Sequence, residues 1–324
     1  MLINKIIVGI LLSFFSLSSF AQIKLVLGHG TGLNSPRQVA AMRFAEIVKR
    51  DSNNRIEVEV AGAARLGDDV AMIDSLLAGT LDMSANSQGP VSAVVPEYNA
   101  FGMPFLFANV TQAWKVLDGP LGKELAQKTA AKGMIVLGYW DNGIRQMTNN
   151  KKPILTPADM KQMNIRTPPD PVTIDIMEAL GAKAFQIKFS DLYAALQQGI
   201  VDGQENPLVN INAGKLYEVQ KYISLTNHKY EMTPFLMSKR TWDGLSEGDR
   251  RIVLNAAAQA TQLQRKLAKE EEEKLLVELK SKGVSINKVQ LKPFVDATNG
   301  VTEKWFASAI GEFTKRVVNA ARAK

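Results

Sequence analysis

The feature that most constrains the fold is one long helical stretch, residues 246–282. Apolar residues recur there at helical spacing, and no proline interrupts them. Ser246 followed by Asp249 is typical of a capped helix start, and Gly283 is typical of a helix stop. At about 1.5 Å per residue, such a helix would reach roughly 50 Å, which is longer than one small domain. It must therefore be kinked or cross a domain boundary.

Before this helix, short apolar strands alternate with amphipathic helices. Strands are expected at 23–28, 56–60, 82–87, 133–140, 162–168, 183–187 and 200–206. Helices are expected at 36–50, 66–79, 173–181 and 189–199, and one more at 301–323 closes the chain. This alternation predicts an α/β protein with largely parallel sheets.

The first 21 residues have the pattern of a secretory signal peptide. The basic start MLINK leads into the apolar run IIVGILLSFFSL, and the small residues Ser19 and Ala21 precede a cleavage point before Gln22. The rival interpretation is a membrane anchor, but the run is shorter than the about 20 apolar residues that a spanning helix needs. No cysteine follows it to carry a lipid, and no later segment is long and apolar enough to span. We therefore expect an exported, soluble chain.

Composition narrows the function further. A 324-residue chain with 46% hydrophobic and 22% charged residues can form two globular domains. It has no cysteine, which excludes disulfides and thiol chemistry. The formal charge is +7, but the lysines and arginines are dispersed among acids, so nucleic acid is not an expected partner.

No strong catalytic motif is present. The two histidines, His29 and His228, are far apart in the sequence, and no metal-binding cluster or nucleophile elbow appears. GHGTGL at 28–33 has Leu33 where a dinucleotide fingerprint needs its last glycine, so it is better explained as a strand–helix turn. VDGQENP at 201–207 could hold a catalytic carboxylate pair or form a ligand-binding loop, and nothing else in the chain supports catalysis.

Two arginines stand where predicted strands end. Arg145 follows the strand at 133–140, and Arg166 ends the strand at 162–168. Ligands of α/β proteins bind at the carboxyl ends of parallel strands, and a guanidinium can hold a carboxylate with two parallel hydrogen bonds. The alternative is that each arginine forms a structural ion pair, for example with Asp141, Asp159 or Asp170.

Long motifs in the chain resemble those of the DctP-like solute-binding proteins of TRAP transporters. They include RLGDDVAMIDSLLAGTLDM, DNGIRQMTN, MNIRTP and FSDLYAALQQGIVDGQENP, and the resemblance covers nearly all of the mature chain. It implies a periplasmic, monomeric protein that binds a small organic acid between two α/β domains and passes it to integral-membrane transporter subunits. Crossing strands and a long helix would join the domains, which we place at 22–142 plus 232–270 and at 143–231 plus 271–324. No enzymatic activity, cofactor or metal is implied.

The resemblance also implies roles for individual residues. Arg166 would hold the ligand carboxylate in a bidentate ion pair, Arg145 would support it, Asn206 would donate to it and Phe189 would pack on the ligand. Asp202 and Glu205 would then hold the binding loop.

The first domain would read the remote end of the ligand through His29, Asp69, Ser87 and Trp140. Trp140 could instead belong to the core, and His29 could instead cap the turn. Ser87 and His29 stand where sialic-acid binders of the family have a glutamate and an asparagine, which argues against sialic acid. The polar residues of this group, His29, Asp69 and Ser87, together with Gln88 favour a hydroxylated ligand such as a sugar acid. An aromatic or short aliphatic acid is the alternative ligand. The rival functions are a ligand-binding sensory partner and an exported enzyme acting on an organic acid.

Overall fold

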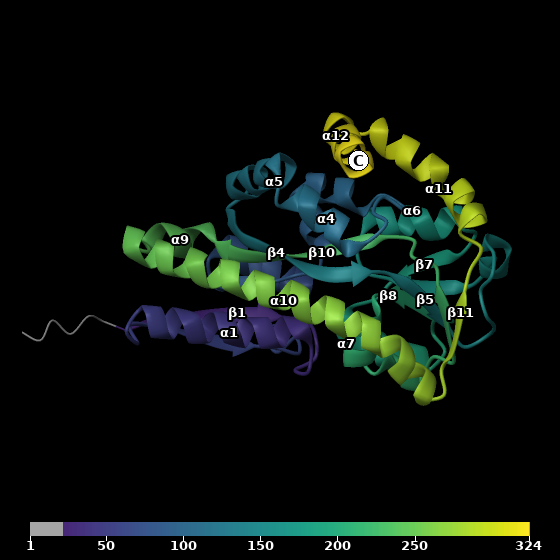
Figure 1. Ribbon diagram of the computed structural model, residues 1–324, viewed down its shortest axis with the longest axis horizontal. Helices are drawn as coiled ribbons and strands as arrows, with labels where there is room; N and C mark the ends of the chain where they lie inside the picture. Colours follow the sequence, from purple (N-terminus) through teal and green to yellow (C-terminus); the bar gives the residue numbers. More distant parts are fainter. Residues whose placement is uncertain (1–21, 324) are drawn as a thin grey trace, which may run out of the picture.

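The computed structural model describes residues 22–323 and has two lobes joined by strands and one long helix (Figure 1). The predicted signal peptide, 1–21, lies outside the described residues. Within them, no helix combines the length and the apolar character needed to span a bilayer.

The first lobe surrounds a five-stranded sheet of order β2-β1-β3-β10-β4. Its strands are β1 (Ile23–His29), β2 (Ile56–Ala61), β3 (Met83–Ala85), β4 (Met134–Ile144) and β10 (Tyr230–Ser238). The second lobe surrounds a six-stranded sheet of order β11-β9-β5-β8-β6-β7. Its strands are β5 (Gln146–Asn149), β6 (Asn164–Thr167), β7 (Lys183–Gln186), β8 (Gly203–Asn206), β9 (Tyr222–Leu225) and β11 (Ser285–Lys288).

Both sheets are mixed, whereas the alternation of strands and helices had predicted largely parallel ones. The chain crosses from β4 through Arg145 directly into β5 of the other sheet, and it returns from β9 into β10. Each entering strand runs antiparallel to both of its neighbours: β5 to β8 and β9, and β10 to β3 and β4. The α/β class with crossing strands is therefore confirmed, and the crossings explain why the sheets are not parallel throughout.

Helices cover both sheets, and local capping explains where several of them begin. The side chains of Ser35, Asp68 and Asp170 accept hydrogen bonds from Gln38 N, Ala71 N and Thr173 N at the starts of α1, α2 and α6. The shorter helices are α1 (Pro36–Asp51), α2 (Asp69–Ala78), α3 (Gln88–Ser92), η1 (Pro96–Gly102), α4 (Val110–Leu117), α5 (Pro120–Ala131), η2 (Pro157–Met160), α6 (Pro171–Ala179), α7 (Phe189–Gln197), α8 (Leu208–Ala213), η3 (Leu216–Glu218) and α9 (Lys239–Gly244).

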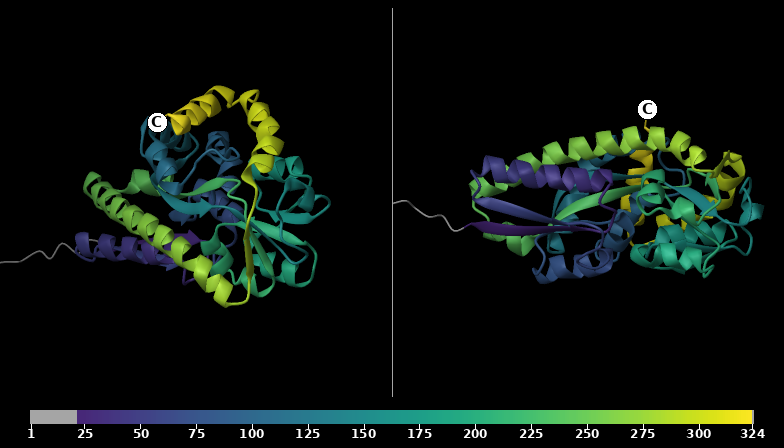
Figure 2. Two further views of the ribbon diagram at one scale, coloured as in Figure 1. Left: turned by 45° about the vertical axis from the view of Figure 1, so that its right-hand side comes forward. Right: turned by 90° about the horizontal axis from the view of Figure 1, so that it is seen from below.

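The long helix α10 (Glu247–Ser281) is continuous over 35 residues and crosses from one lobe to the other (Figures 1 and 2). Ser246 caps it by accepting a hydrogen bond from Asp249 N. Near its start, Ala257 and Ala260 pack into a cluster of the first lobe with residues of α1 and β4. Near its end, Leu275 and Leu279 pack into the apolar cluster of the second lobe. The sequence predicted either a kinked helix or a helix that crosses a domain boundary, and the second prediction is therefore correct.

The expected single C-terminal helix at 301–323 is wrong, because the chain forms two helices, α11 (Leu291–Phe306) and α12 (Gly311–Arg322). Helix α11 packs on α6 of the second lobe, but α12 returns to the first lobe and packs on α4 and η1. There the Phe313 ring lies 6.2 Å from that of Phe101, and Arg316 pairs with Glu124 of α5. Residues 311–322 thus contact the first lobe, although the sequence placed them with the second.

Candidate functional site

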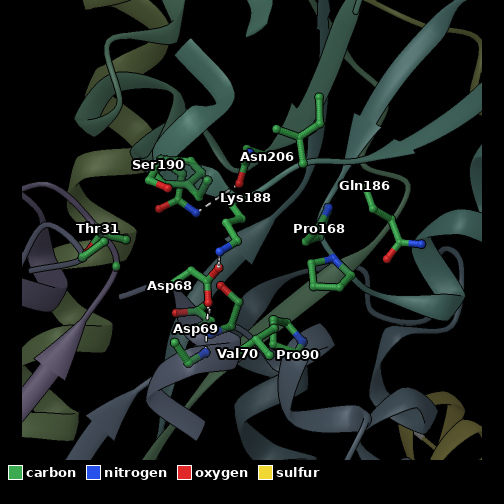
Figure 3. Close-up of a pocket in the computed structure, with 18 of the residues that line it drawn as sticks. Thr31, Asp68, Asp69, Val70, Pro90, Pro168, Gln186, Lys188, Ser190 and Asn206 are labelled. Carbon is green, nitrogen blue, oxygen red and sulfur yellow. Dashed lines mark hydrogen bonds and ion pairs between the residues drawn. The ribbon is translucent and has the colours of Figure 1, made fainter. Parts of the chain in front are cut away.

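A cavity of about 390 Å³ lies between the two lobes (Figure 3). The second lobe contributes the segments that follow β6, β7 and β8, and the first lobe contributes the segment after β1 and the start of α2. The cavity therefore lies at the carboxyl ends of parallel strands, where α/β proteins bind ligands. Its size is in the range of small-molecule sites.

Arg166, on β6, lines this cavity and is 2% exposed. Its Nε donates to the carbonyl oxygen of Ile187 at 2.8 Å, and this is its one hydrogen bond within residues 22–323. Its other N–H groups are therefore available to an acceptor in the cavity. Burial lowers the pKa of Arg166 to about 10, so the guanidinium is still charged at neutral pH. The Phe189 ring lies 6.0 Å from it and also lines the cavity.

Arg145 lines the cavity at the point where the chain crosses between the lobes. It pairs with Glu205 of β8 and Glu231 of β10, and all three side chains are at most 2% exposed. Its Nη2 donates to Glu205 Oε1 at 2.7 Å and to Asn206 Oδ1 at 3.2 Å. Burial by itself would lower the pKa of Arg145, but the two glutamates outweigh burial and raise it. Arg145 is thus a charged residue whose hydrogen bonds go mainly to the protein.

The acids considered as arginine partners are engaged elsewhere. Asp159 pairs with Lys152, Asp170 pairs with Lys229, and Asp141 accepts a hydrogen bond from the Trp114 indole at 3.0 Å. The expected ion pairing of Arg145 exists, but its partners are Glu205 and Glu231.

Asn206 lines the cavity at the end of β8 and is 3% exposed. Its Nδ2 donates to Gln204 Oε1 at 2.6 Å, which leaves one amide hydrogen for a ligand. Asp202, in the same segment, accepts from Asn164 N at 2.8 Å, and this bond ties the segment to β6.

Two of the four residues predicted for the first lobe reach the cavity. Asp69 and Ser87 line it, and Asp69 Oδ2 accepts from the backbone N–H of Ser87 at 3.0 Å. His29 and Trp140 are not among the lining residues, and both are fully buried. The structure therefore assembles Arg166, Arg145, Asn206, Phe189, Asp69 and Ser87 around one cavity.

The surroundings of His29 and Trp140 match the alternatives that the sequence left open. His29 bonds to Gln38 and Thr31 in the turn after β1, through ring nitrogens at 2.7 and 3.2 Å. The Trp140 indole donates to Thr261 Oγ1 at 3.1 Å, inside the apolar cluster beneath α10. Gln88, which supported the expectation of a hydroxylated ligand, donates to the carbonyl of Tyr98 and does not line the cavity.

Sequence reasoning missed Arg37 and Glu231, which both line the cavity. Arg37 donates to Thr233 Oγ1 at 2.6 Å and to Asn142 Oδ1 at 3.2 Å, and burial lowers its pKa. It occupies the buried face of α1, one turn before Ala40 and Ala41. The sequence signal that could have identified both residues is a charged side chain at a position where an apolar one is expected. Arg37 stands at such a position in α1, and Glu231 stands at one in the buried strand β10.

Two α/β lobes around a cleft with buried arginines define the class of two-domain solute-binding proteins. Residues 27–309 match the family model "Bacterial extracellular solute-binding protein, family 7", known as DctP. The chain belongs to this family, so the resemblance noted in the sequence and the predicted function of solute capture are confirmed. In the described part of the chain, no group of acids or histidines could hold a metal ion.

Similar proteins match over most of the chain. The Escherichia coli 2,3-diketo-L-gulonate-binding periplasmic protein YiaO is 32% identical over 300 residues, covering 92% of both proteins. The uncharacterized protein y4mM of Sinorhizobium fredii is 50% identical over 280 residues, which are 86% of this chain and 52% of y4mM. The chain therefore spans about half the length of that relative.

Solved structures match the fold closely. The sugar acid binding protein DctPAm of Advenella mimigardefordensis, in complex with galactonate, has a TM-score of 0.91 and 35% identity, covering 94% of this chain and 99% of that one. A TRAP periplasmic solute-binding protein of Polaromonas bound to D-erythronate has a TM-score of 0.90 and 35% identity, covering 94% and 100%. These likenesses confirm the predicted fold class.

Proposed function

We propose that this protein captures a small organic acid, of the sugar acid class, in the cleft between its lobes and delivers it to the membrane subunits of a TRAP transporter. The observation that carries the proposal is Arg166, a buried cation that lines the cavity and whose terminal N–H groups donate to no described residue. The sugar acids bound by the solved relatives support the ligand class.

In this proposal, the carboxylate of the ligand forms a bidentate ion pair with the terminal nitrogens of Arg166. Asn206 donates its remaining amide hydrogen to the carboxylate, and Phe189 packs on the body of the ligand. Arg145 supports the carboxylate mainly by its charge, because most of its donors are already bound to Glu205, Glu231 and Asn206. Asp69 and Ser87 face the remote end.

The two lobes act as the two domains of the binding protein, and they close around the ligand by bending at the crossing segments and at α10. In this proposal the domains are 22–142 plus 232–270 and 143–231 plus 271–324, except that α12 belongs with the first domain because it contacts η1 and α4. The mature chain begins after a cleaved signal peptide, works in the periplasm as a monomer and carries out no reaction.

A thermal-shift screen of the mature protein tests the proposal. The protein is unfolded and refolded to remove carried-over ligand, and it is then melted with a library of organic acids. A ligand at 100 times its Kd should add about 2.7 kcal/mol to the free energy of unfolding. A rise in Tm confined to sugar acids supports the proposal. The absence of any rise with carboxylates, in protein that is folded, would contradict it.

A further inference from the structure

Glu231 is a buried acid on β10 that lines the cavity and is 0% exposed. Its Oε2 pairs with Nη1 of Arg145 and accepts from Asn142 Nδ2 at 2.9 Å. Its Oε1 has no hydrogen-bond partner among residues 22–323. Burying a carboxylate oxygen without a donor is unfavourable, and such atoms in folded proteins are normally satisfied. The site therefore lacks one hydrogen-bond donor at Glu231.

The nearest cationic side chains do not supply this donor. Arg37 donates through Nη2 to Asn142 and Thr233 and through Nη1 to the carbonyl of Ala85. Arg145 contacts Glu231 only through the oxygen that is already paired. A carboxylate can only accept hydrogen bonds, so the group that completes the site must carry an O–H or N–H.

The position of Glu231 indicates which part of a ligand would reach it. Arg145 bridges Glu231 and Asn206, the residue proposed to contact the ligand carboxylate. On a hydroxy acid whose carboxylate contacts Asn206, the hydroxyl group nearest to this side of the cavity is the one on the carbon next to the carboxylate. We infer that Glu231 accepts a hydrogen bond from the hydroxyl group at carbon 2 of the ligand, and that the cleft selects 2-hydroxy monocarboxylates over dicarboxylates. This inference rests on the proposed function.

The charges around the cavity support selection of a monocarboxylate. Three buried guanidinium groups, those of Arg37, Arg145 and Arg166, face two buried carboxylates, those of Glu205 and Glu231. These five groups carry one net positive charge and Asp69, which also lines the cavity, carries a negative one, so the cavity has no surplus cation for a second ligand carboxylate. The first-lobe wall adds Asp68 and Asp69 at the start of α2 (Figure 3). Lys188 neutralises Asp68, but Asp69 would repel a second carboxylate while accepting hydrogen bonds from hydroxyl groups.

Isothermal titration calorimetry with matched acids tests the inference on the unmodified mature protein. The probes are D-erythronate, 3,4-dihydroxybutanoate, which lacks only the 2-hydroxyl, and succinate, with D-galactonate and its 2-deoxy form as a six-carbon pair. We expect the better-bound 2-hydroxy acid to bind about 100-fold more tightly than its 2-deoxy form, because loss of the hydroxyl leaves the buried oxygen of Glu231 without a donor. Succinate should bind at least as weakly as the 2-deoxy acid.

The variant Glu231→Gln tests the residue itself. It keeps the size of the side chain but replaces the charged carboxylate with a neutral amide, which is a weaker acceptor. The ratio of affinities between the 2-hydroxy and 2-deoxy acids should therefore fall below about 10-fold. The matched control is Glu205→Gln. Glu205 pairs with the same arginine but does not line the cavity, so this change should weaken both acids alike and leave the ratio near its wild-type value. Circular dichroism and melting curves establish that both variants are folded.

The outcomes separate the inference from the proposed function. If the 2-deoxy acids bind as tightly as their parents, or if succinate binds best, the inference is overturned and carboxylate capture stands. If the ratio survives Glu231→Gln, another residue reads the hydroxyl and the assignment to Glu231 is wrong. If none of these acids nor any acid of the thermal-shift library binds, the proposed function itself fails, and the inference fails with it.

Discussion

Lys188 of the second lobe and Asp68 of the first form an ion pair across the cavity, with Lys188 Nζ 2.8 Å from Asp68 Oδ2 (Figure 3). Both residues line the cavity and immediately precede a helix, α7 and α2 respectively. The Lys188 side chain is 65% exposed, so solvent screens the pair and its free energy is small. Because its partners belong to different lobes, the pair is lost when the lobes separate. It therefore favours the closed arrangement.

The variant Lys188→Gln should release ligand about 1.4- to fivefold faster than the wild type, because an exposed pair contributes about 0.2–1 kcal/mol. Stopped-flow dissociation at low and high salt measures this. The wild-type rate should rise with salt, and the variant rate should change less. Lys152→Gln is the control, since Lys152 pairs with Asp159 within the second lobe. Equal effects of the two substitutions would contradict a role across the cavity.

Arg166→Ala should weaken binding of the true ligand by about 2–5 kcal/mol, because the ligand carboxylate would be buried without its partner. Calorimetric titration measures the loss. The control is Arg316→Ala, which removes an exposed arginine that pairs with Glu124 away from the cavity. Affinity close to that of the wild type in Arg166→Ala would refute the assignment of Arg166 as the anchor.

Arg145→Met should destabilise the ligand-free protein by about 3–5 kcal/mol, because Glu205 and Glu231 would remain as buried carboxylates without their cation. Urea denaturation gives the free energy of unfolding. Arg166→Met is the matched control: it also removes a buried guanidinium from the cavity wall, but one with no ion-pair partner in the described chain. The prediction fails if both variants are equally stable.

The parts of this fold that depend on neighbouring residues were predictable from the sequence. The caps at Ser35 and Ser246 lie where the pattern placed them, because a cap joins a side chain to a backbone N–H three residues further on. The length of α10 indicated that this helix either crosses a domain boundary or is kinked. Arg166 and Asn206 were found through family motifs together with their position at strand ends.

What depends on distant contacts was not predictable. The partners of Arg145 are 60 and 86 residues away, and no local pattern identifies them. The apolar face of α12 indicates burial but not which lobe buries it. Trp140 is followed by two further buried residues, Asp141 and Asn142, so alternation along β4 could not show which side chains reach the cleft.

The last prediction concerns the pH dependence of stability. Burial, assisted by the positive charge of Arg37, lowers the pKa of His29 from 6.5 to about 4. Between these values the unfolded chain binds a proton at this histidine and the folded chain does not, so stability falls as the pH falls from 6.5 to 4. The shift corresponds to about 3 kcal/mol, fully present above pH 6.5 and lost near pH 4. His228, whose pKa burial also lowers, acts in the same direction.

His29→Asn should therefore reduce the slope of stability against pH between 4 and 6.5, and the double variant with His228→Asn should reduce it further, since the chain has two histidines. Urea denaturation at half-unit pH steps measures the slopes. Asp141, whose pKa burial raises to about 6, acts in the opposite direction, but it does so in every variant and cancels in the comparison. Glu205 titrates lower, because the charge of Arg145 outweighs burial and brings its pKa to about 2. A wild-type slope retained in His29→Asn would show that His29 is already protonated in the folded protein.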